Sequence, residues 1–289
     1  MGGATFVGFI AVATWALLAL LTDLSGNVPP FQLLAMSFAI GAAPGIIAMV
    51  LQPQRRAALY QPWPVWALGV GGLFGYHFCY FTALDNAPAV DASLIAYLWP
   101  LFIVLGSALM PGETLKTHHV LGALLGLGGA ALIVTKGGAV SFDAQYGFGY
   151  GMAAMCALIW SGYSLLSRRN AGVPSDIVAG FCLAAAALGL VSHLAFEQTI
   201  WPQTIGEWSA IALLGLIPLG VAFLAWDYGV KHGNIQVLGA ASYAAPLLST
   251  LVLIAAGRAE LTGVTIFACL LITGGAVLAA KDMILRKDR

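Results

Sequence analysis

Long apolar runs, separated by short polar or proline-containing breaks, dominate the hydrophobic pattern of the chain. A helix that crosses about 30 Å of hydrocarbon needs about 20 mostly apolar residues, and runs of this length recur from end to end. The first run resembles the later ones and lacks a basic region and an early cleavage site, so we expect it to be retained as a membrane helix. The pattern predicts an all-α integral membrane protein with ten transmembrane helices, over residues 4–22, 31–51, 63–84, 89–110, 117–135, 146–167, 175–196, 207–230, 235–256 and 262–281.

The composition agrees with a bilayer as the main solvent. Apolar residues make up 60% of the 289 residues and charged residues only 8%, against about a quarter in an ordinary soluble domain. A soluble protein of this size needs more charge, because exposed apolar patches beyond a few hundred Å² drive association. The 12 basic and 12 acidic residues balance, so the net charge gives no indication of a nucleic-acid partner.

The four cysteines indicate neither a disulfide framework nor a metal site. Cys79, Cys156, Cys182 and Cys269 lie inside apolar runs, without C-x-x-C spacing. We expect reduced packing residues at these positions, and we expect neither a metal ion nor a cofactor.

Lysine and arginine lie mainly on one side of the predicted membrane. The loops after odd-numbered helices contain only Lys136 and Arg258. The positive-inside rule then places both termini in the cytoplasm, which requires an even number of helices. The side predicted to be cytoplasmic carries ten basic residues: Arg55, Arg56, Lys116, Arg168, Arg169, Lys231, Lys281, Arg286, Lys287 and Arg289.

The sequence also matches itself at a shift of 145 to 146 residues. Trp15 aligns with Trp160, and Tyr97 aligns with Tyr243. These matches divide the chain into two repeats of five predicted helices each, 1–139 and 140–289, within one transporter unit.

Because five is an odd number, the second repeat enters the membrane from the opposite side to the first. Many transporters use such inverted repeats to build two related conformations around a substrate site near the membrane midplane. Duplication can also serve only to build a stable bundle, and some channels and membrane enzymes are duplicated as well.

A motif on the fourth predicted helix carries a family resemblance. Its residues are Tyr97-Leu98-Trp99-Pro100, followed by Gly106, Gly112-Glu113, Leu115, Gly122 and Gly128-Gly129. Together they resemble the signature of the drug/metabolite transporter superfamily, in its ten-helix EamA-type branch, over nearly the whole chain. The Tyr-Leu-Trp-Pro sequence is most similar to that of the bacterial aromatic amino acid exporters, whereas the second repeat has Tyr243-Ala244-Ala245-Pro246.

The resemblance implies an exporter or exchanger of amino acids, metabolites or drugs in the bacterial inner membrane. It also implies a central cavity between two four-helix halves, with the fifth helix of each repeat outside them. We expect a monomer, with a dimer as the alternative.

Pro100 and Pro246 are predicted to lie in the middle of membrane helices. Proline removes one backbone hydrogen bond, which here frees the carbonyls of Ala96 and Ser242. Irregular backbone at this depth usually lines a cavity, so these carbonyls are candidate acceptors for a substrate ammonium. The alternative is that the two prolines act only as kinks or hinges.

Aromatic residues are predicted at mid-membrane positions of several helices. Aromatic side chains in membrane proteins more often pack or form interfacial belts than bind ligands. Several here are mid-span and stacked at helical spacing, however, and such walls suit an aromatic or cationic substrate. The candidate substrate-binding residues are His77, Tyr80, Tyr97, Trp99, Trp160, Tyr163, Trp226 and Tyr243.

His77 is the ionisable candidate predicted deep within a helix. Ionisable residues inside the membrane are by default functional candidates. His77 could bind a substrate carboxylate or exchange a proton near neutral pH. The alternative is a neutral histidine that donates to a nearby carbonyl.

The predicted helices contain no clear central carboxylate, and carboxylates kept in a membrane usually serve coupling. The acidic residues weighed for this role all fall near helix ends or in loops: Asp85, Asp91, Glu113, Asp227 and Glu260. The pattern therefore favours facilitative transport. With the resemblance, it predicts export of small amphipathic metabolites, namely aromatic and other neutral amino acids, by alternating access.

Three other functions remain open at this point. A proton-coupled exporter of lipophilic cationic drugs would also use aromatic walls. An intramembrane enzyme would need a nucleophile with its base, a metal cluster or paired carboxylates, and no G-x-S-x-G, H-E-x-x-H or carboxylate pair occurs within a predicted helix. A channel would need a filter loop or a ring of like charge, and neither is evident.

Overall fold

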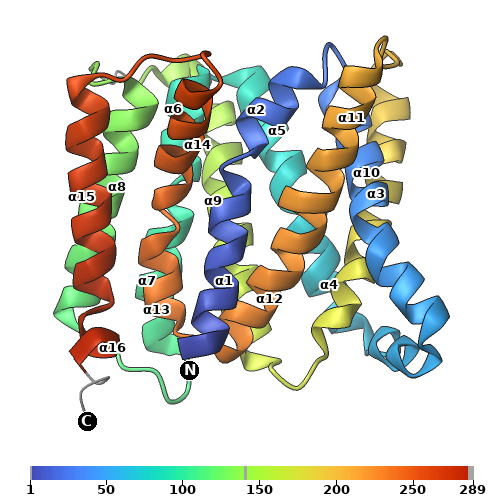
Figure 1. The fold of residues 1–289 in the computed structure, drawn as a ribbon, viewed down its shortest axis with the longest axis horizontal. Coiled ribbons are helices and arrows are strands. Elements are labelled where there is room, and N and C mark those ends of the chain that lie inside the picture. Colours follow the sequence, from blue (N-terminus) through green and yellow to red (C-terminus); the bar gives the residue numbers. More distant parts are fainter. Residues whose placement is uncertain (1, 140–141, 286–289) are drawn as a thin grey trace.

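The computed structural model describes residues 2–139 and 142–285, and its regular elements are helices. The helices run between the two ends of one bundle (Figure 1). The first helix, α1 (Gly2–Trp15), begins at the same end as the last, α16 (Lys281–Leu285). We call this the basic end, because its loops and helix termini carry Arg55, Arg56, Lys116, Arg168, Arg169 and Lys231.

The remaining α-helices are α2 (Leu18–Leu24), α3 (Pro30–Leu51), α4 (Trp63–Val70), α5 (Tyr76–Asn86), α6 (Ala89–Ala96), α7 (Trp99–Gly106), α8 (Thr117–Thr135), α9 (Gly147–Arg169), α10 (Val178–Phe196), α11 (Ile205–Leu214), α12 (Ala222–His232), α13 (Ile235–Ala241), α14 (Ala244–Ala255) and α15 (Gly263–Ala279). In the described part of the chain, four short 3-10 helices join them: η1 (Pro53–Leu59), η3 (Ser107–Leu109), η4 (Ala144–Tyr146) and η5 (Ser175–Ile177). Within the same residues, two π-helical segments, η2 (Gly71–Gly75) and η6 (Gly215–Val221), lie inside longer helices.

Eight helical segments of the described chain are long and apolar enough to cross a membrane, and they coincide with eight of the predicted helices. The tenth predicted helix overlaps α15, a shorter apolar helix of 17 residues. The sixth overlaps α9, which has 23 residues but is not among the eight. The chain is therefore a multi-pass membrane protein, and the count of ten stays a prediction.

The fourth and ninth predicted helices are not continuous. Two residues separate α6 from α7, and two separate α13 from α14. Pro100 and Pro246 lie in the first turn of the helix that follows each break, where proline is tolerated because the N–H it lacks would have no helical partner. The prolines thus begin a second half-helix, and the free N–H and C=O groups at each break need other partners.

The π-helical segments were not predicted from the sequence. Segment η2 joins α4 to α5, and η6 joins α11 to α12, at corresponding places in the two sequence repeats. A π turn pairs residues five apart, so it leaves a wider and locally irregular backbone.

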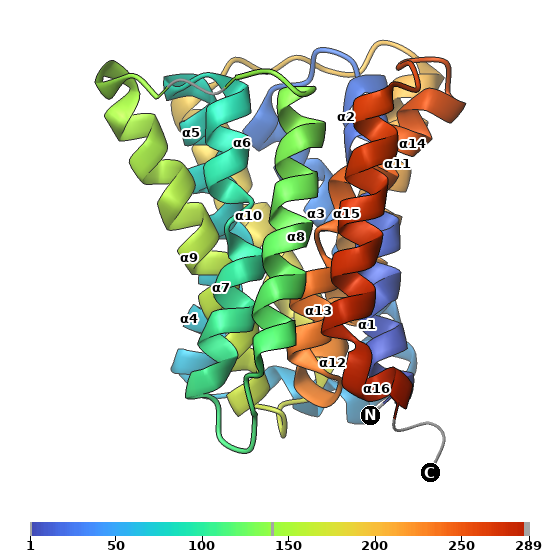
Figure 2. The same cartoon turned by 90° about the vertical axis from the view of Figure 1, so that its left-hand side faces the viewer.

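Helices α8 and α15 pack side by side at one edge of the bundle (Figures 1 and 2). Their backbones touch at Gly122 and Gly275, where a methyl group on either residue would come within 2.5 Å of the other's carbonyl oxygen. Small residues at a helix crossing permit this close packing in a membrane, where no hydrophobic force drives helices together.

The surface of the bundle is apolar where a soluble protein would be charged. Phe6, Leu194 and Leu270 are 69%, 71% and 66% exposed, which suits contact with lipid chains. All four cysteines are free, and Cys79, Cys156 and Cys182 are buried. The burial of these three agrees with their prediction as packing residues, whereas Cys269 is only half-buried.

Candidate functional site

Five aromatic side chains from α1, α7, α9 and α12 meet in the interior of the bundle. Trp15 lies at the centre, with ring centroids 5.2 Å from Trp226, 5.8 Å from Trp160, 6.2 Å from Trp99 and 6.3 Å from Phe223. Their edge-to-face and tilted arrangements are the favourable ones for aromatic rings. We call these five residues the aromatic cluster.

Helix breaks help to place the cluster. Trp15 is the last residue of α1, and Trp99 is the first residue of α7. The irregular backbone also supplies a partner, since the Trp15 indole N–H donates to the Pro218 carbonyl in η6 at 3.1 Å. The sequence predicted Trp99, Trp160 and Trp226 as lining residues, and the structure brings all three together.

The indole groups of the cluster differ in their hydrogen bonding. Trp226 donates to the Ser164 hydroxyl at 3.0 Å. Within the described residues, the indole N–H groups of Trp99 and Trp160 have no hydrogen-bond partner, and neither nitrogen is fully enclosed. Two donors are therefore available to a ligand or to water.

His77 lies beside the cluster and extends it toward α3. Its ring is 5.1 Å from Phe38 and 6.2 Å from Phe223. Its Nδ1 is 2.7 Å from the Leu73 carbonyl oxygen. Because a carbonyl can only accept, Nδ1 carries the proton in this bond, and Nε2 of the neutral ring is left as an acceptor.

Tyr80 and Tyr97 remain half-buried, as His77 does. The Tyr80 hydroxyl is 3.3 Å from the Ser93 hydroxyl, which ties α5 to α6.

Tyr163 borders the aromatic cluster, with its ring centroid 5.3 Å from that of Trp160, whereas Tyr243 lies elsewhere. Tyr243 is fully buried and packs with residues of α7, α8 and α15, apart from the aromatic cluster. Its hydroxyl accepts a hydrogen bond of 3.1 Å from the Leu101 N–H, one of the groups released by the break before α7. The Ser242 carbonyl accepts from the Ala245 N–H at 3.0 Å, so the expectation that Pro246 leaves this carbonyl free is wrong for this conformation.

Buried charges lie near the basic end. Asp227 and Lys231, four residues apart on α12, form an ion pair of 2.7 Å with side chains only 1% and 3% exposed. The Lys231 ammonium also donates to the Val173 carbonyl at 2.9 Å, and the Tyr163 hydroxyl donates to Asp227 at 3.3 Å. Paired charges with further hydrogen bonds are the form in which buried charges are tolerated.

A second pair lies next to the first. Arg168, at the end of α9, forms an ion pair with Glu113 and donates to the carbonyls of Val230 and Gly233 at 2.9 and 2.8 Å. The Gln236 amide donates to Glu113 at 3.0 Å. These bonds join α9, α12, α13 and the segment before α8. We call the two pairs and their partners the ion network.

Sequence reasoning missed this network. It placed Lys231 in a loop, whereas Lys231 lies in the last turn of α12 with its side chain buried. The spacing of Asp227 and Lys231 was the available signal, since residues four apart share a helix face. Glu113 and Arg168 meet only through the tertiary fold.

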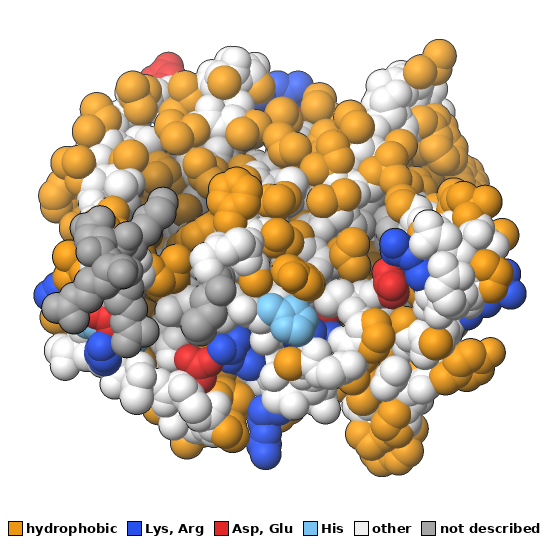
Figure 3. Space-filling model, turned by 60° about the horizontal axis from the view of Figure 1, so that its bottom comes forward, with side chains coloured by type: hydrophobic (Ala, Val, Ile, Leu, Met, Phe, Trp, Pro, Cys, Tyr) orange, Lys and Arg blue, Asp and Glu red, His pale blue; other side chains and the backbone are white. Residues whose placement is uncertain are grey.

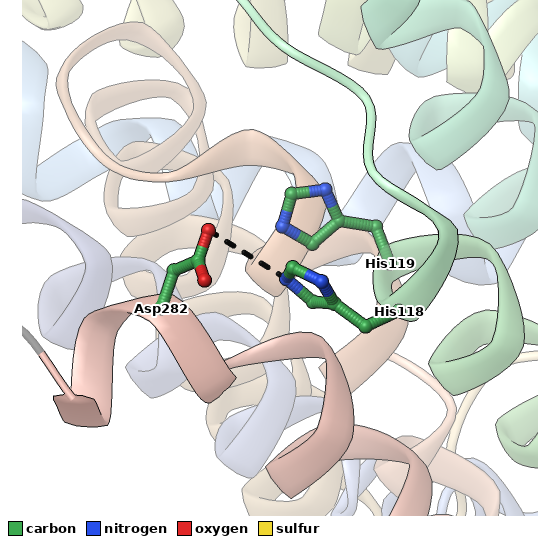
Figure 4. Close-up of side chains that lie close together, drawn as sticks. All are labelled: His118, His119 and Asp282. Atoms are coloured by element: carbon green, nitrogen blue, oxygen red, sulfur yellow. Dashed lines mark ion pairs between the residues drawn. The ribbon is translucent and has the colours of Figure 1, made fainter.

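One group of side chains has the composition of a metal site. His118, His119 and Asp282 place one ligand atom each within 4.8 Å of one another (Figure 4). Lys116 forms an ion pair with Asp282, and this bond lowers the pKa of the Asp282 carboxyl. The His119 Nδ1 already accepts from the Lys116 N–H at 3.2 Å. The Lys116 ammonium next to the Asp282 carboxylate would repel a divalent cation. We therefore interpret this group as a polar contact, here called the clamp, that holds α16 against α8, and not as a metal site.

Comparisons with known proteins agree with these features. The model of the EamA-like transporter family matches residues 3–135 and, again, 147–281. The chain is 52% identical to the aromatic amino acid exporter YddG of Ancylobacter novellus over 277 residues, covering 96% of each chain. It is 27% identical to the aromatic amino acid exporter YddG of Salmonella typhimurium over 86% of each chain.

A more distant relative and a solved structure also match the chain over most of its length. The pseudopaline exporter CntI of Pseudomonas aeruginosa is 27% identical over 75% of each chain. A solved crystal structure that is 52% identical in sequence superposes with a TM-score of 0.91, covering 96% of this chain and 97% of the other.

Proposed function

The chain belongs to the EamA-like transporter family, and on that premise we propose that it exports aromatic and other neutral amino acids across the bacterial inner membrane. The matching family and the relatives named above are transporters and not enzymes. The structural observation that carries the proposal is the aromatic cluster with two indole N–H groups free of partners and His77 beside it.

The chemistry of these groups suits an aromatic amino acid. The side-chain ring packs against Trp15 and Trp160, where an aromatic pair contributes about 0.5–1.5 kcal/mol beyond burial. The substrate carboxylate accepts from the indole N–H of Trp99, and the ammonium donates to Nε2 of His77. Half-buried Tyr80 and Tyr97 complete the path on the side away from the ion network.

We propose ten membrane helices in two inverted repeats, with both termini in the cytoplasm. Three observations support this arrangement: the basic residues at one end of the bundle, the two separate family matches, and the helix breaks and π segments at corresponding places in both halves.

The same symmetry supports alternating access. We propose that the ion network closes the basic end in this conformation, since its charges are buried and paired, while His77, Tyr80 and Tyr97 retain partial exposure. An exchange of conformations between the two repeats would open the basic end and close the other. We propose facilitative transport, because the buried carboxylates Asp227 and Glu113 are already neutralised by Lys231 and Arg168.

Efflux from liposomes tests the function. The purified protein is reconstituted, and efflux of radiolabelled tryptophan, phenylalanine and alanine and of a quaternary ammonium dye is followed with and without a pH gradient. We expect saturable amino acid efflux that is fastest for the aromatic substrates and indifferent to the gradient. Dye efflux driven by the gradient, without amino acid efflux, would replace this proposal with proton-coupled drug export.

A further inference from the structure

A groove of about 690 Å³ opens at the basic end between α1, α12 and the segment that leads into η5. Its long wall is apolar and includes Val7, Ile10, Val221 and Leu224. Ile10, Val221 and Leu224 are 37%, 49% and 43% exposed, so this wall belongs to the outer, lipid-facing surface of the bundle. The groove therefore opens toward lipid rather than toward the aromatic cluster.

The end of the groove nearest the loops is polar. Arg55, Ser175, Asp176 and His232 line it. Arg55 donates through Nε to Gln52 at 2.7 Å and through Nη1 to Asp176 at 3.2 Å. A guanidinium has five N–H donors, and among the described residues those on Nη2 have no partner. Arg55 can thus bind an anion without leaving Asp176.

The basic end as a whole carries an excess of positive charge. Figure 3 looks onto this end and shows charged side chains and a histidine among apolar ones. Four ion pairs at this end join Arg55, Lys116, Arg168 and Lys231 to acidic partners. In the described chain, three further basic residues at this end lack an acidic partner: Arg56, Arg169 and Lys281.

We propose that this groove binds an anionic phospholipid. The phosphate lies at Arg55 and His232, and an acyl chain follows Ile10 and Leu224 toward the middle of the membrane. From His232 to Val221 the helix rises roughly 16 Å, which is long enough for a glycerol backbone and a stretch of acyl chain. Basic pockets between helices on the cytoplasmic side of membrane proteins recognise anionic head groups in this way.

The bound lipid would be distinct from the transported substrate. The groove includes Ala225 and Tyr228, whereas Phe223 and Trp226 point from other faces of α12 into the aromatic cluster. The groove also includes Val173, whose carbonyl accepts from Lys231. A lipid in the groove therefore contacts the segment that anchors the ion network without touching the proposed substrate site.

Thermal unfolding of the detergent-solubilised protein tests the site, with native mass spectrometry to count bound lipids. Phosphatidylglycerol is added at increasing concentration and compared with phosphatidylcholine. We expect phosphatidylglycerol to raise the unfolding midpoint more, because a ligand that binds only the folded state stabilises it. Arg55→Gln should weaken the apparent affinity for phosphatidylglycerol about fivefold.

Arg56→Gln is the matched control, because it removes the same charge from a neighbouring residue that does not line the groove. It should keep the wild-type affinity. Leu224→Trp should block the apolar wall and reduce lipid binding while Arg55 stays intact. Equal effects of the two lipids on the wild type, or equal losses in the Arg55 and Arg56 variants, would overturn the proposal. Stabilisation by inorganic phosphate alone, equal to that by the lipid, would show an anion site and also overturn it.

Discussion

Helices α5 and α12 occupy equivalent places in the two sequence repeats, but they are buried very differently. At the shift of 146 residues, His77 corresponds to Phe223 and Phe81 to Asp227. Only two of the eleven residues of α5 are buried, whereas eight of the eleven in α12 are. The two helices therefore occupy equivalent sequence positions but differ in burial, and α12 is the one that carries a buried ion pair.

The broken helices show the same contrast. Tyr97 and Tyr243 both lie at the break of their helix. Tyr97 is half-buried, whereas Tyr243 is fully buried and accepts from the Leu101 N–H in the other repeat. The tyrosine of the first repeat is thus partly exposed, whereas the tyrosine of the second repeat forms a structural hydrogen bond to the first repeat.

The largest expected effect comes from the charges that distinguish α12 from α5. Asp227→Ala leaves the Lys231 ammonium buried without its counter-ion, and breaking such a pair costs about 3–5 kcal/mol. Thermal or denaturant unfolding of the purified protein measures the loss. The matched control is Phe81→Ala at the equivalent place in α5, which is half-buried and should lose less.

A double variant, Asp227→Leu with Lys231→Met, removes both charges and should recover most of the stability. Equal losses in Asp227→Ala and Phe81→Ala would mean that the ion pair does not account for the difference between the two helices.

A smaller effect should separate the two kinds of indole in the aromatic cluster. Trp99→Phe removes an N–H that has no protein partner, so it should raise the KM for tryptophan about tenfold, which corresponds to one lost hydrogen bond to a charged group. Because Trp99 is buried, the smaller ring should also lower the unfolding midpoint, but by less than Trp226→Phe does. Trp226→Phe removes the bond to Ser164 and should lower the unfolding midpoint. Liposome efflux and thermal unfolding on both variants check this, and the reverse pattern would contradict the assignment of Trp99 to the substrate.

The two tyrosines at the breaks provide a third comparison. Tyr243→Phe leaves the Leu101 N–H without its acceptor and should cost roughly 1 kcal/mol. Tyr97→Phe should leave the unfolding free energy unchanged, because its hydroxyl has no hydrogen-bond partner among the described residues. If both variants unfold at the same denaturant concentration as the wild type, the Tyr243 bond does not stabilise the break.

The smallest effect is expected at the exposed clamp between α16 and α8. The ion pair with Lys116 lowers the pKa of Asp282 below its ordinary value of 3.8. The stabilisation by this pair is therefore present above that value and is lost as the pH falls through the lower folded pKa. Asp282→Asn should therefore lower the unfolding midpoint slightly at pH 7, and the difference from wild type should shrink toward pH 3. Lys116→Gln should give the same small loss, and combining the two should add nothing.

The sequence was sufficient for the apolar helices but not for their irregularities. Runs of about 20 apolar residues locate a span, and Pro100 and Pro246 indicated disturbed backbone. They did not reveal that the helices stop and restart, or that η2 and η6 are π-helical, because these depend on how neighbouring helices satisfy the released backbone groups.

The candidate site could be predicted only in part, because the sequence shows the residue types but not their hydrogen-bond partners. Trp99, Trp160 and Trp226 were identified because large aromatic residues at mid-span are visible in the sequence. The partners that decide their roles, such as Ser164 for Trp226 and Leu101 for Tyr243, lie 62 and 142 residues away. Only the fold brings them together.

The π segments bear on how the two halves of the gene diverged. Trp63 aligns with Trp208 at a shift of 145, while α5 and α12 align at 146, so one residue was gained or lost between these points. That stretch contains η2 in one half and the longer η6 in the other. An insertion in a regular α-helix would turn everything beyond it by about 100°, but a widened turn absorbs the extra residue locally. The duplicated copies could therefore change length inside a membrane helix without misdirecting the side chains beyond it.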